Sequence, residues 1–314
     1  MKSICFFTAM ILITGLAAAA DYSSAPPGFQ PAEVETAPAD LSPAVEQVNS
    51  SDGEDAGSAT APERPVGGRA YAFNEVNWSL IDWLGGDALL GLDIVSHSGD
   101  MYVMTPRHDS LYFADRDDGS VADKFPLDPA NISPFGCYPY GSVNVNDFNN
   151  TDLFNSIDLG VSWTAYTNPA GQEGRGMDVD YSTSLVWQTY STTDLVSFSH
   201  LSPSGDFHDV SGVVTDHMSG LAVYENGGDH WLFVTGYNID WAYIFDLDNN
   251  LDYIGTADFP YTTVEKSYGL TYDDTRDTFF WSFKNTSDNV YLIELELEET
   301  ALEQSTWGTI KSAF

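Results

Sequence analysis

From Arg69 onward the chain alternates short apolar runs with polar turns, and this pattern predicts β-strands. The runs are rich in β-branched and aromatic residues, and Gly, Asn, Asp and Ser separate them. Few apolar positions follow the 3.6-residue spacing of an amphipathic helix. Many short strands bounded by turn residues are typical of an all-β protein.

The strand pattern also repeats along the chain. Each copy has the order Gly-apolar-x-apolar, a polar turn, an aromatic-rich strand, a turn that ends in Asp, and another apolar strand. The copies begin at Gly91, Gly176, Gly220 and Gly269, and a weaker copy surrounds Gly136. The Asp of the second turn recurs at spacings of 43, 42, 46 and 48 residues, as Asp109, Asp152, Asp194, Asp240 and Asp288. A period of about 40–50 residues with three or four strands per copy predicts a β-propeller, here with five blades.

The last copy lacks an outer strand. The first four copies are followed by a fourth strand, the runs "VADKFPL", "GVSWTAY", "FHDVSGVV" and "LDYIGTADF", whereas no such run follows the fifth copy. The run "RAYAFNEV" at the start of the domain has no repeat partner and could fill this place. Pairing the two ends of the domain would remove both free sheet edges. The sequence therefore predicts a five-bladed β-propeller over residues 69–300, closed by its N-terminal strand.

The residues before and after this domain have a different character. Lys2, an apolar run over residues 4–15 and the small residues 17–20 predict a signal peptide over residues 1–20. The apolar run is too short to span a membrane. Residues 21–68 are rich in Pro, Ala, Ser and acidic side chains, which predicts a disordered linker. Residues 301–314 form a C-terminal tail. We expect a secreted protein, extracellular or periplasmic.

The charge balance narrows the range of partners. The chain has 47 acidic residues against 11 Lys and Arg, a net charge of −36. Such a polyanion repels nucleic acid and anionic membranes, so neither nucleic-acid binding nor membrane insertion is expected. Cys137 is the one cysteine outside the signal peptide. We expect it to be a small buried hydrophobic residue in a monomer without disulfides.

The stretch "DLDNNLD" over residues 246–252 resembles a calcium loop because oxygen-bearing side chains alternate along it. A loop of the EF-hand type requires Gly at its sixth position and Glu at its twelfth. Counted from Asp246, these places hold Leu251 and Ala257. The Asn249-Asn250 pair instead favours a tight hairpin turn, since Asn tolerates positive φ. We expect a connection between the third and fourth strands of its unit.

The repeat resembles the extracellular propellers of the YWTD and NHL type. The resemblance lies in "GLTYDDTRDTFFWSF" and "GLAVYENGGDHWLFVTGY" and covers residues 70 to 298. It implies ligand or protein binding more often than catalysis. We therefore expect a secreted, non-catalytic recognition module that binds a protein, a glycan or a small anionic ligand at the face of the central channel.

Candidate ligand-binding residues lie in the loops that a propeller places on one face, between the second and third strands and between units. The cations in these loops are Arg107, His108, Arg175, His217, Lys266 and Lys284. In a chain with few cations they could attract an anionic group. The alternative is that they neutralise neighbouring Asp residues. Tyr237, Asn238 and Trp241 also differ from the other copies, so they are further candidates for ligand contact.

The alternative function is a divalent-metal-dependent hydrolase or lyase. The fold class resembles that of propeller lactonases, which implies one divalent ion, such as calcium, at the channel mouth. The resemblance implies Asp93, Asp178, Glu75 and Asn131 as its ligands. The chain has no zinc spacing such as H-E-x-x-H, no G-x-S-x-G and no Walker loop. No other cofactor is expected. Converging carboxylate and amide oxygens at the channel mouth would favour the enzyme, whereas an aromatic and cationic mouth would favour binding.

Overall fold

The computed structural model describes residues 62–127, 132–190, 193–261, 264–285 and 287–299. The predicted signal peptide over 1–20, most of the linker over 21–68 and the tail over 301–314 lie outside these residues. The described residues contain strands but no helix, and hence none of the length and apolar character needed to cross a membrane. The predicted all-β class is confirmed.

Three of the sheets are antiparallel and have four strands each, in chain order from one edge to the other. The first sheet contains β2 (Asp93–His97), β3 (Asp100–Arg107), β4 (Ser110–Asp115) and β5 (Val121–Pro126). The second contains β6 (Pro134–Pro139), β7 (Val143–Asp147), β8 (Asp152–Ser156) and β9 (Thr164–Thr167). The third contains β10 (Gly174–Asp180), β11 (Leu185–Tyr190), β12 (Asp194–Ser199) and β13 (Asp206–Asp209).

The remaining strands form one sheet of eight strands, which consists of two units of the same kind. One unit contains β14 (Met218–Asn226), β15 (Asp229–Gly236), β16 (Trp241–Asp246) and β17 (Asp252–Asp258). The other contains β18 (Val264–Asp273), β19 (Thr278–Asn285), β20 (Val290–Glu299) and β1 (Arg69–Leu80). As the sequence predicts, β1 pairs antiparallel with the strand of the last copy, β20. The first residues of β1 also pair parallel with β17, which joins the two units.

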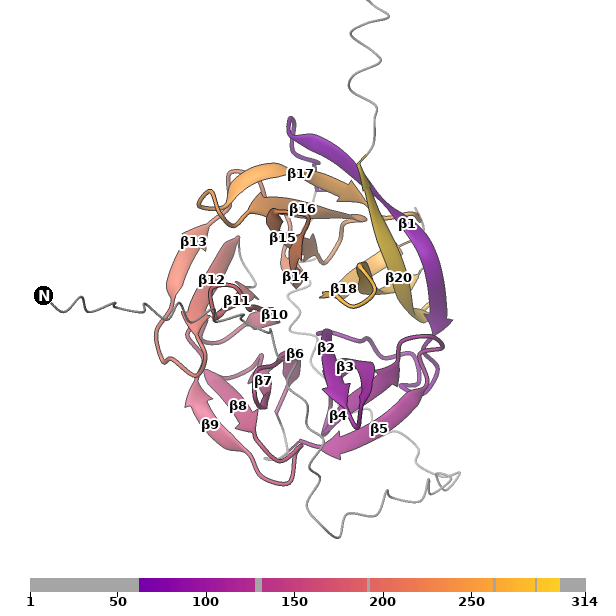
Figure 1. Cartoon of the computed structure of the whole chain (residues 1–314), viewed down its shortest axis with the longest axis vertical. Coiled ribbons are helices and arrows are strands. Elements are labelled where there is room, and N and C mark those ends of the chain that lie inside the picture. Colours follow the sequence, from indigo (N-terminus) through magenta and orange to yellow (C-terminus); the bar gives the residue numbers. More distant parts are fainter. Residues whose placement is uncertain (1–61, 128–131, 191–192, 262–263, 286, 300–314) are drawn as a thin grey trace, which may run out of the picture.

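The units surround a common axis, with β2, β6, β10, β14 and β18 innermost (Figure 1). Each innermost strand contacts the innermost strand of the next unit, and β18 contacts β2, so these contacts form a closed ring. This is the arrangement of a β-propeller. The recurring Asp residues of the sequence stand at or just before the third strand of each unit, as the repeat predicts.

The glycine that opens each repeat lies where neighbouring innermost strands touch. These glycines are Gly91, Gly136, Gly176, Gly220 and Gly269. A Cβ atom on Gly136 would lie 2.2 Å from the carbonyl oxygen of Arg175, and one on Gly220 would lie 2.5 Å from that of Tyr268. Only glycine permits backbones to approach this closely. The repeated Gly is therefore explained by contact between units around the axis.

Buried hydroxyl groups reinforce the same contacts from the second strands. Thr189 Oγ1 donates to the carbonyl oxygen of Ser219 at 3.0 Å, and Thr235 Oγ1 donates to that of Tyr268 at 3.1 Å. Ser282 Oγ donates to the carbonyl oxygen of Leu89 at 2.6 Å and so links the last unit to the first. Each bond satisfies a hydroxyl that would be costly to bury unpaired. The ring closes through polar contacts as well as strand pairing.

The stretch over residues 246–252 is the hairpin turn that the sequence predicts. It joins β16 to β17, the third and fourth strands of their unit. Asp246 Oδ1 accepts from the backbone N–H groups of Asp248 and Asn249 at 3.0 and 3.1 Å. Asn250 has a φ of 55°, as expected for a tight turn, and Leu251 follows with 61°. The carboxylate oxygens of Asp246 thus hold the turn itself.

Residues 62–68 belong to the predicted linker yet lie against the propeller. The Arg64 guanidinium forms an ion pair with Asp258 at 2.5 Å and lies 5.1 Å from the centre of the Trp241 ring. Thr215 Oγ1 donates to the carbonyl oxygen of Glu63 at 3.3 Å. These contacts fix the direction from which the chain enters β1.

Candidate functional site

A cavity of about 380 Å³ lies between the innermost strands of the units. Its lining combines acidic, aromatic and apolar side chains. The lining residues are Asp93, Ile94, Ser96, Met101, Pro139, Asp178, Val179, Tyr181, Val223, Glu225, Tyr272, Asp274 and Thr275. Apart from Met101 on β3, they come from the five innermost strands of the described units or from the turns that follow them. A concave site with a few convergent polar groups is the usual form of a small-molecule site.

Asp93, at the start of β2, is buried with 6% of its surface exposed. Its Oδ1 atom accepts a hydrogen bond from the backbone N–H of Ile94 at 2.6 Å. Its Oδ2 atom has no hydrogen-bond partner among the described residues. Burial, together with the charge of Asp178, raises the pKa of Asp93 well above its usual range. This carboxyl group therefore holds its proton to a higher pH than an exposed Asp does.

Asp178, at the matching place in β10, also lines the cavity with 6% of its surface exposed. Its two oxygens accept from the backbone N–H groups of Val179 at 2.6 Å and Val223 at 2.8 Å. Burial raises the pKa of Asp178 to about 7, although the two backbone donors oppose the shift. Asp180 and Asp274 add repulsion in the same direction as burial. The bond to Val223 also ties β10 to β14.

The two buried carboxyl groups predict that stability falls as the pH rises. A raised pKa in the folded state means that folding retains protons, so the stabilisation is complete below about pH 4 and is lost as the pH rises through about 7. We expect the free energy of unfolding to fall by on the order of 4 kcal/mol over this range, at about 1.4 kcal/mol per pKa unit. Urea unfolding at a series of pH values measures this slope.

The Asp178→Asn variant serves as the control for this slope. It removes the titrating group but leaves in place the histidines whose pKa values are also shifted, namely His200, His208 and His230. We expect a flatter dependence between pH 5 and 8 than in the unchanged protein. An equal slope in both proteins would contradict the shifted pKa of Asp178.

A second group of polar side chains meets at the opposite ends of β10 and β18. Lys266, near the start of β18, donates to Asn238 Oδ1 at 2.8 Å, and its Nζ lies 4.3 Å from the centre of the Tyr237 ring. Tyr237 and Asn238 belong to the loop between β15 and β16. Asp216 holds this loop, since it accepts from the Asn238 backbone N–H at 2.5 Å and from Nδ2 at 3.0 Å.

Arg175 approaches the same tyrosine from the third unit. Its guanidinium carbon lies 6.0 Å from the centre of the Tyr237 ring. It also lies 5.5 and 5.3 Å from the ring centres of Phe135 and Phe148 in the second unit. Arg175 is buried and donates to the carbonyl oxygen of Met218 at 3.3 Å. We call Arg175, Tyr237, Asn238 and Lys266 the cation–aromatic cluster; all four are candidates that the sequence singles out.

Three other predicted cations have carboxylate partners. Arg107 and His108 both contact Asp87, and the His108 Nε2 atom lies 2.5 Å from its Oδ2. Lys284 forms an ion pair with Asp288 at 2.6 Å. These pairs match the alternative in which the cations neutralise nearby Asp residues. Asp87 was not among the partners expected from the sequence, because it lies about twenty residues before Arg107 in the chain.

The remaining predicted ligand contacts lie apart from the cluster or at its edge. Trp241 is buried with 8% of its surface exposed and packs in the core with Tyr243 and Trp187. His217 is exposed, and its carbonyl oxygen accepts from the Tyr237 backbone N–H at 2.8 Å. The sequence predicts Trp241 beside a loop as a ligand contact. In the structure Trp241 is the first residue of β16, and its side chain packs in the core.

The four metal ligands implied by the lactonase resemblance do not come together. Asp93 and Asp178 line one cavity, whereas Glu75 is exposed on the outer strand β1 opposite Leu295. Asn131 lies outside the described residues. Among the residues that the structure describes, no three His, Cys, Asp or Glu side chains are placed to hold one metal ion. The described residues therefore do not fit the ligand set that the resemblance implies.

Several cavity residues were missed in the sequence. Glu225, Tyr272 and Asp274 stand at the ends of innermost strands or just beyond them, where the repeat has variable polar residues. The alternation of side chains along a strand could have indicated them, because Val223 and Glu225 stand two residues apart, as do Tyr272 and Asp274, and both pairs line the cavity. The aligned copies drew attention to the loops at the other ends of these strands instead.

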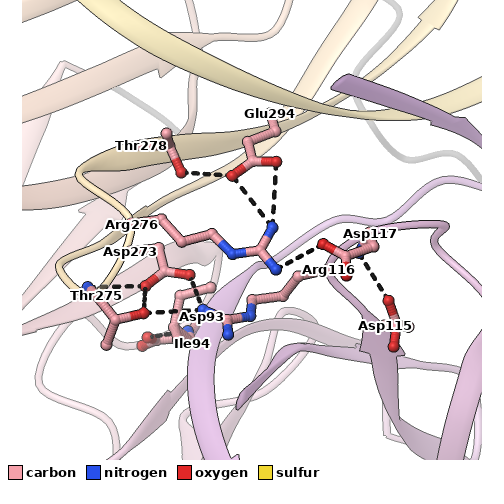
Figure 2. A network of polar contacts seen from close by, with 10 residues as sticks. All are labelled: Asp93, Ile94, Asp115, Arg116, Asp117, Asp273, Thr275, Arg276, Thr278 and Glu294. Atoms are coloured by element: carbon pink, nitrogen blue, oxygen red, sulfur yellow. Dashed lines mark hydrogen bonds and ion pairs between the residues drawn. The ribbon is translucent and has the colours of Figure 1, made fainter. Parts of the chain in front are cut away.

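Figure 2 shows a polar network beside the cavity that joins the last unit to the first. Arg116, from the turn after β4, contacts the fully buried Asp273 and donates to Thr275 Oγ1 at 2.9 Å. Arg276 donates to Asp117 at 2.6 Å and to Glu294 at 3.3 Å. Thr275 and its neighbour Asp274 both line the cavity. The network thus holds the rim of the cavity in place.

Comparison with one solved structure, at a TM-score of 0.52, supports the fold. No protein-family model and no curated protein sequence match this chain. The glutaminyl cyclase of Myxococcus xanthus is similar in structure, with a TM-score of 0.52 and 14% identity over 74% of this chain and 100% of its own. Virginiamycin B lyase from Staphylococcus aureus has a TM-score of 0.41 and 13% identity, over 64% of this chain and 62% of its own. A chain of a nidogen/laminin complex has a TM-score of 0.44 and 10% identity, over 67% of this chain and 84% of its own.

These solved structures are propeller-type folds. At 14% identity the likeness to the Myxococcus xanthus protein concerns the fold alone. The chain is an all-β protein of the propeller type.

Proposed function

We propose that the protein is a secreted, monomeric recognition module of five blades that binds an anionic group at the cation–aromatic cluster. The observation that carries the proposal is that the described side chains give Lys266 polar and aromatic contacts but no carboxylate partner. Its ammonium group donates to Asn238 and lies over Tyr237, and no carboxylate of the described side chains lies within ion-pair distance of it.

The geometry of the cluster supports an anionic ligand. A lysine ammonium has three donors, and one is used by Asn238. The buried Arg175 adds a second positive charge on the same tyrosine ring. Both cations are partly desolvated, which strengthens their attraction for a carboxylate or a phosphate. Because the chain has a net charge of −36, this local positive region would also steer an approaching anion to the cluster.

Titration calorimetry with citrate and with inorganic phosphate tests the proposal. We expect the Lys266→Gln variant to bind these anions at least about tenfold more weakly, as the loss of one charge-assisted hydrogen bond predicts. Affinity should also fall with added sodium chloride, because a charge interaction at a half-exposed site is screened.

Two variants serve as matched controls. Lys124 also lies over a tyrosine ring, at 5.2 Å from the centre of Tyr112, but stands exposed on the outer strand β5. Arg107, the last residue of β3, precedes the corresponding loop of the first unit and is neutralised by Asp87. Lys124→Gln and Arg107→Gln should bind citrate as the unchanged protein does. No citrate or phosphate binding at millimolar concentration, or an equal loss in all three variants, would reject the proposal.

The metal-dependent enzyme is the second candidate, because Asp93 and Asp178 line one cavity. It requires ligands other than Glu75, which is exposed on β1. Thermal unfolding in the presence of calcium tests it: a higher melting temperature at millimolar calcium would support a bound ion. No change would reject a calcium-dependent activity.

A further inference from the structure

We propose that the cavity lined by Asp93 and Asp178 binds an organic ammonium ion, as a second ligand site separate from the cation–aromatic cluster. The cluster lies near the start of β18, whereas the cavity lies at its end. Lys266 and Tyr272 are six residues apart on this strand, which corresponds to about 20 Å. The glycines that bring the innermost strands into contact, such as Gly269, lie between them.

The unpartnered oxygen of Asp93 is the first support for a bound cation. A buried carboxylate oxygen normally accepts a hydrogen bond, and leaving it unpaired costs free energy. Asp93 Oδ2 belongs to a side chain that is 94% buried, since its exposed fraction is 6%, and it lines the cavity without a partner among the described residues. A donor from a ligand in the cavity would satisfy it.

The charge of the lining is the second support. Asp93, Asp178, Glu225 and Asp274 all line the cavity, and none of its lining residues is Lys, Arg or His. Asp178 lies close enough for its charge to act on Asp93. Arg116, which donates to the lining residue Thr275, is already paired with Asp273. The carboxylates of the cavity therefore lack a counter-charge, and a cationic ligand would supply one.

The apolar part of the lining selects the class of cation. Ile94, Met101, Pro139, Val179 and Val223 line the same space. A hard divalent ion requires six or more oxygen ligands around it, which these walls do not offer. An ammonium group with an apolar body fits both parts of the lining. The ring of Tyr272 could also contribute, since ammonium ions bind the faces of aromatic rings.

Proton competition gives the site a pH dependence. Asp180 on β10 and Asp274 after β18 raise the pKa of Asp178, and Glu225 on β14 faces the same cavity. Burial and the charges of Asp93 and Asp178 raise the pKa of the Cys137 thiol on β6. His230 on β15 pairs with Asp180, and Arg116 pairs with Asp273. Burial raises the pKa of Asp178 to about 7, so protons compete with an ammonium ion in this region. The affinity for an ammonium ion should therefore rise from pH 6 to pH 8.5. If binding displaces one proton, the rise is at most about tenfold for each pH unit.

Titration calorimetry with benzylamine, with benzyl alcohol as its neutral counterpart, tests the proposal on the full chain. We expect benzylamine to bind at least about tenfold more tightly than benzyl alcohol at pH 8. The Asp93→Asn and Asp178→Asn variants should each lose at least about tenfold in benzylamine affinity. Asp206→Asn, an exposed change on β13, should have no effect. Comparison of the two probes on the unchanged protein still decides the proposal if a variant fails to fold.

Three outcomes would overturn it. Equal binding of benzylamine and benzyl alcohol would indicate an apolar pocket without a role for charge. Binding of calcium chloride but not of benzylamine would assign the carboxylates to a divalent ion. If neither benzylamine nor benzyl alcohol bound, the cavity would not be a site for an organic cation. Lys266→Gln should not alter benzylamine binding, and Asp93→Asn should not alter citrate binding, so this proposal and the proposed anion site fail independently.

Discussion

Replacing Gly136 by alanine is expected to lower the free energy of unfolding by about 3 kcal/mol or more, since overpacking of a rigid contact has costs of this order. A Cβ atom there would lie 2.2 Å from the carbonyl oxygen of Arg175 and 3.1 Å from the backbone nitrogen of Met177. Both are backbone atoms of β10, so no side-chain rotation relieves the contact. Urea unfolding followed by tryptophan fluorescence measures the change.

Two other glycines provide the controls. Gly212 has no atom within 4 Å of its added Cβ and no positive φ, so Gly212→Ala should change stability by less than about 0.5 kcal/mol. A Cβ on Gly269 would first meet the Leu92 side chain, at 2.7 Å, and side chains can move. Gly269→Ala should therefore cost less than Gly136→Ala. If Gly136→Ala were as stable as Gly212→Ala, contact between units would not be the reason for the repeated glycine.

Replacing Phe73 by alanine is expected to cost about 3–5 kcal/mol, the usual range for a fully buried phenylalanine. Phe73 belongs to β1, which closes the ring, and only 2% of its surface is exposed. Its ring centre lies 5.2 Å from that of Phe279, 5.7 Å from that of Trp281 and 6.0 Å from that of Phe233. The side chain therefore packs between the last unit and the unit before it.

The exposed Phe207 on β13 is the matched control for this change. With 57% of its surface exposed, Phe207→Ala should alter stability by less than about 0.5 kcal/mol. Denaturant unfolding of both variants compares the two sites under the same conditions. A loss at Phe73 no larger than that at Phe207 would mean that β1 packs against the propeller without contributing to its closure.

The two proposed sites have opposite charge and lie along the same innermost strands. Lys266 and Tyr272 mark the two regions on β18, and Arg175 and Asp178 mark them on β10. Because the glycine contacts lie between the regions, a ligand at one would not displace a ligand at the other. The protein would then hold an anionic group near one end of the axis and a cationic group near the other.

The residues of the cation–aromatic cluster were predicted in part from the sequence. The sequence pointed to Arg175 and Lys266 as cations in the loops of one face, and to Tyr237 and Asn238 because they differ from the other copies. The structure brings these four residues together. It grouped them with Arg107 and Lys284, whose carboxylate partners emerge only in the folded chain. Asp87 is remote from Arg107 in sequence, so no local pattern could reveal their pairing. Asp93 and Asp178 were named as metal ligands implied by the lactonase resemblance, and the structure places both in the lining of one cavity.

The sequence by itself determined the all-β class, the repeating unit and the pairing of the first strand with the last copy. These features depend on local alternation and on a period that each copy repeats, so they can be read along the chain. The positions of the hairpin turn at Asp246 and of the recurring Asp residues follow for the same reason. Burial of Cys137 also agrees with its place in an apolar strand.

Only the tertiary structure decided which charges are neutralised and which remain for a ligand. That outcome depends on distances between side chains from different units, such as Lys266 and Tyr237 or Asp178 and Val223. It also decided that Glu75 faces away from the cavity, because β1 runs along the outside of the ring. Electrostatic free energy varies steeply with distance and burial, and a linear pattern of residues specifies neither.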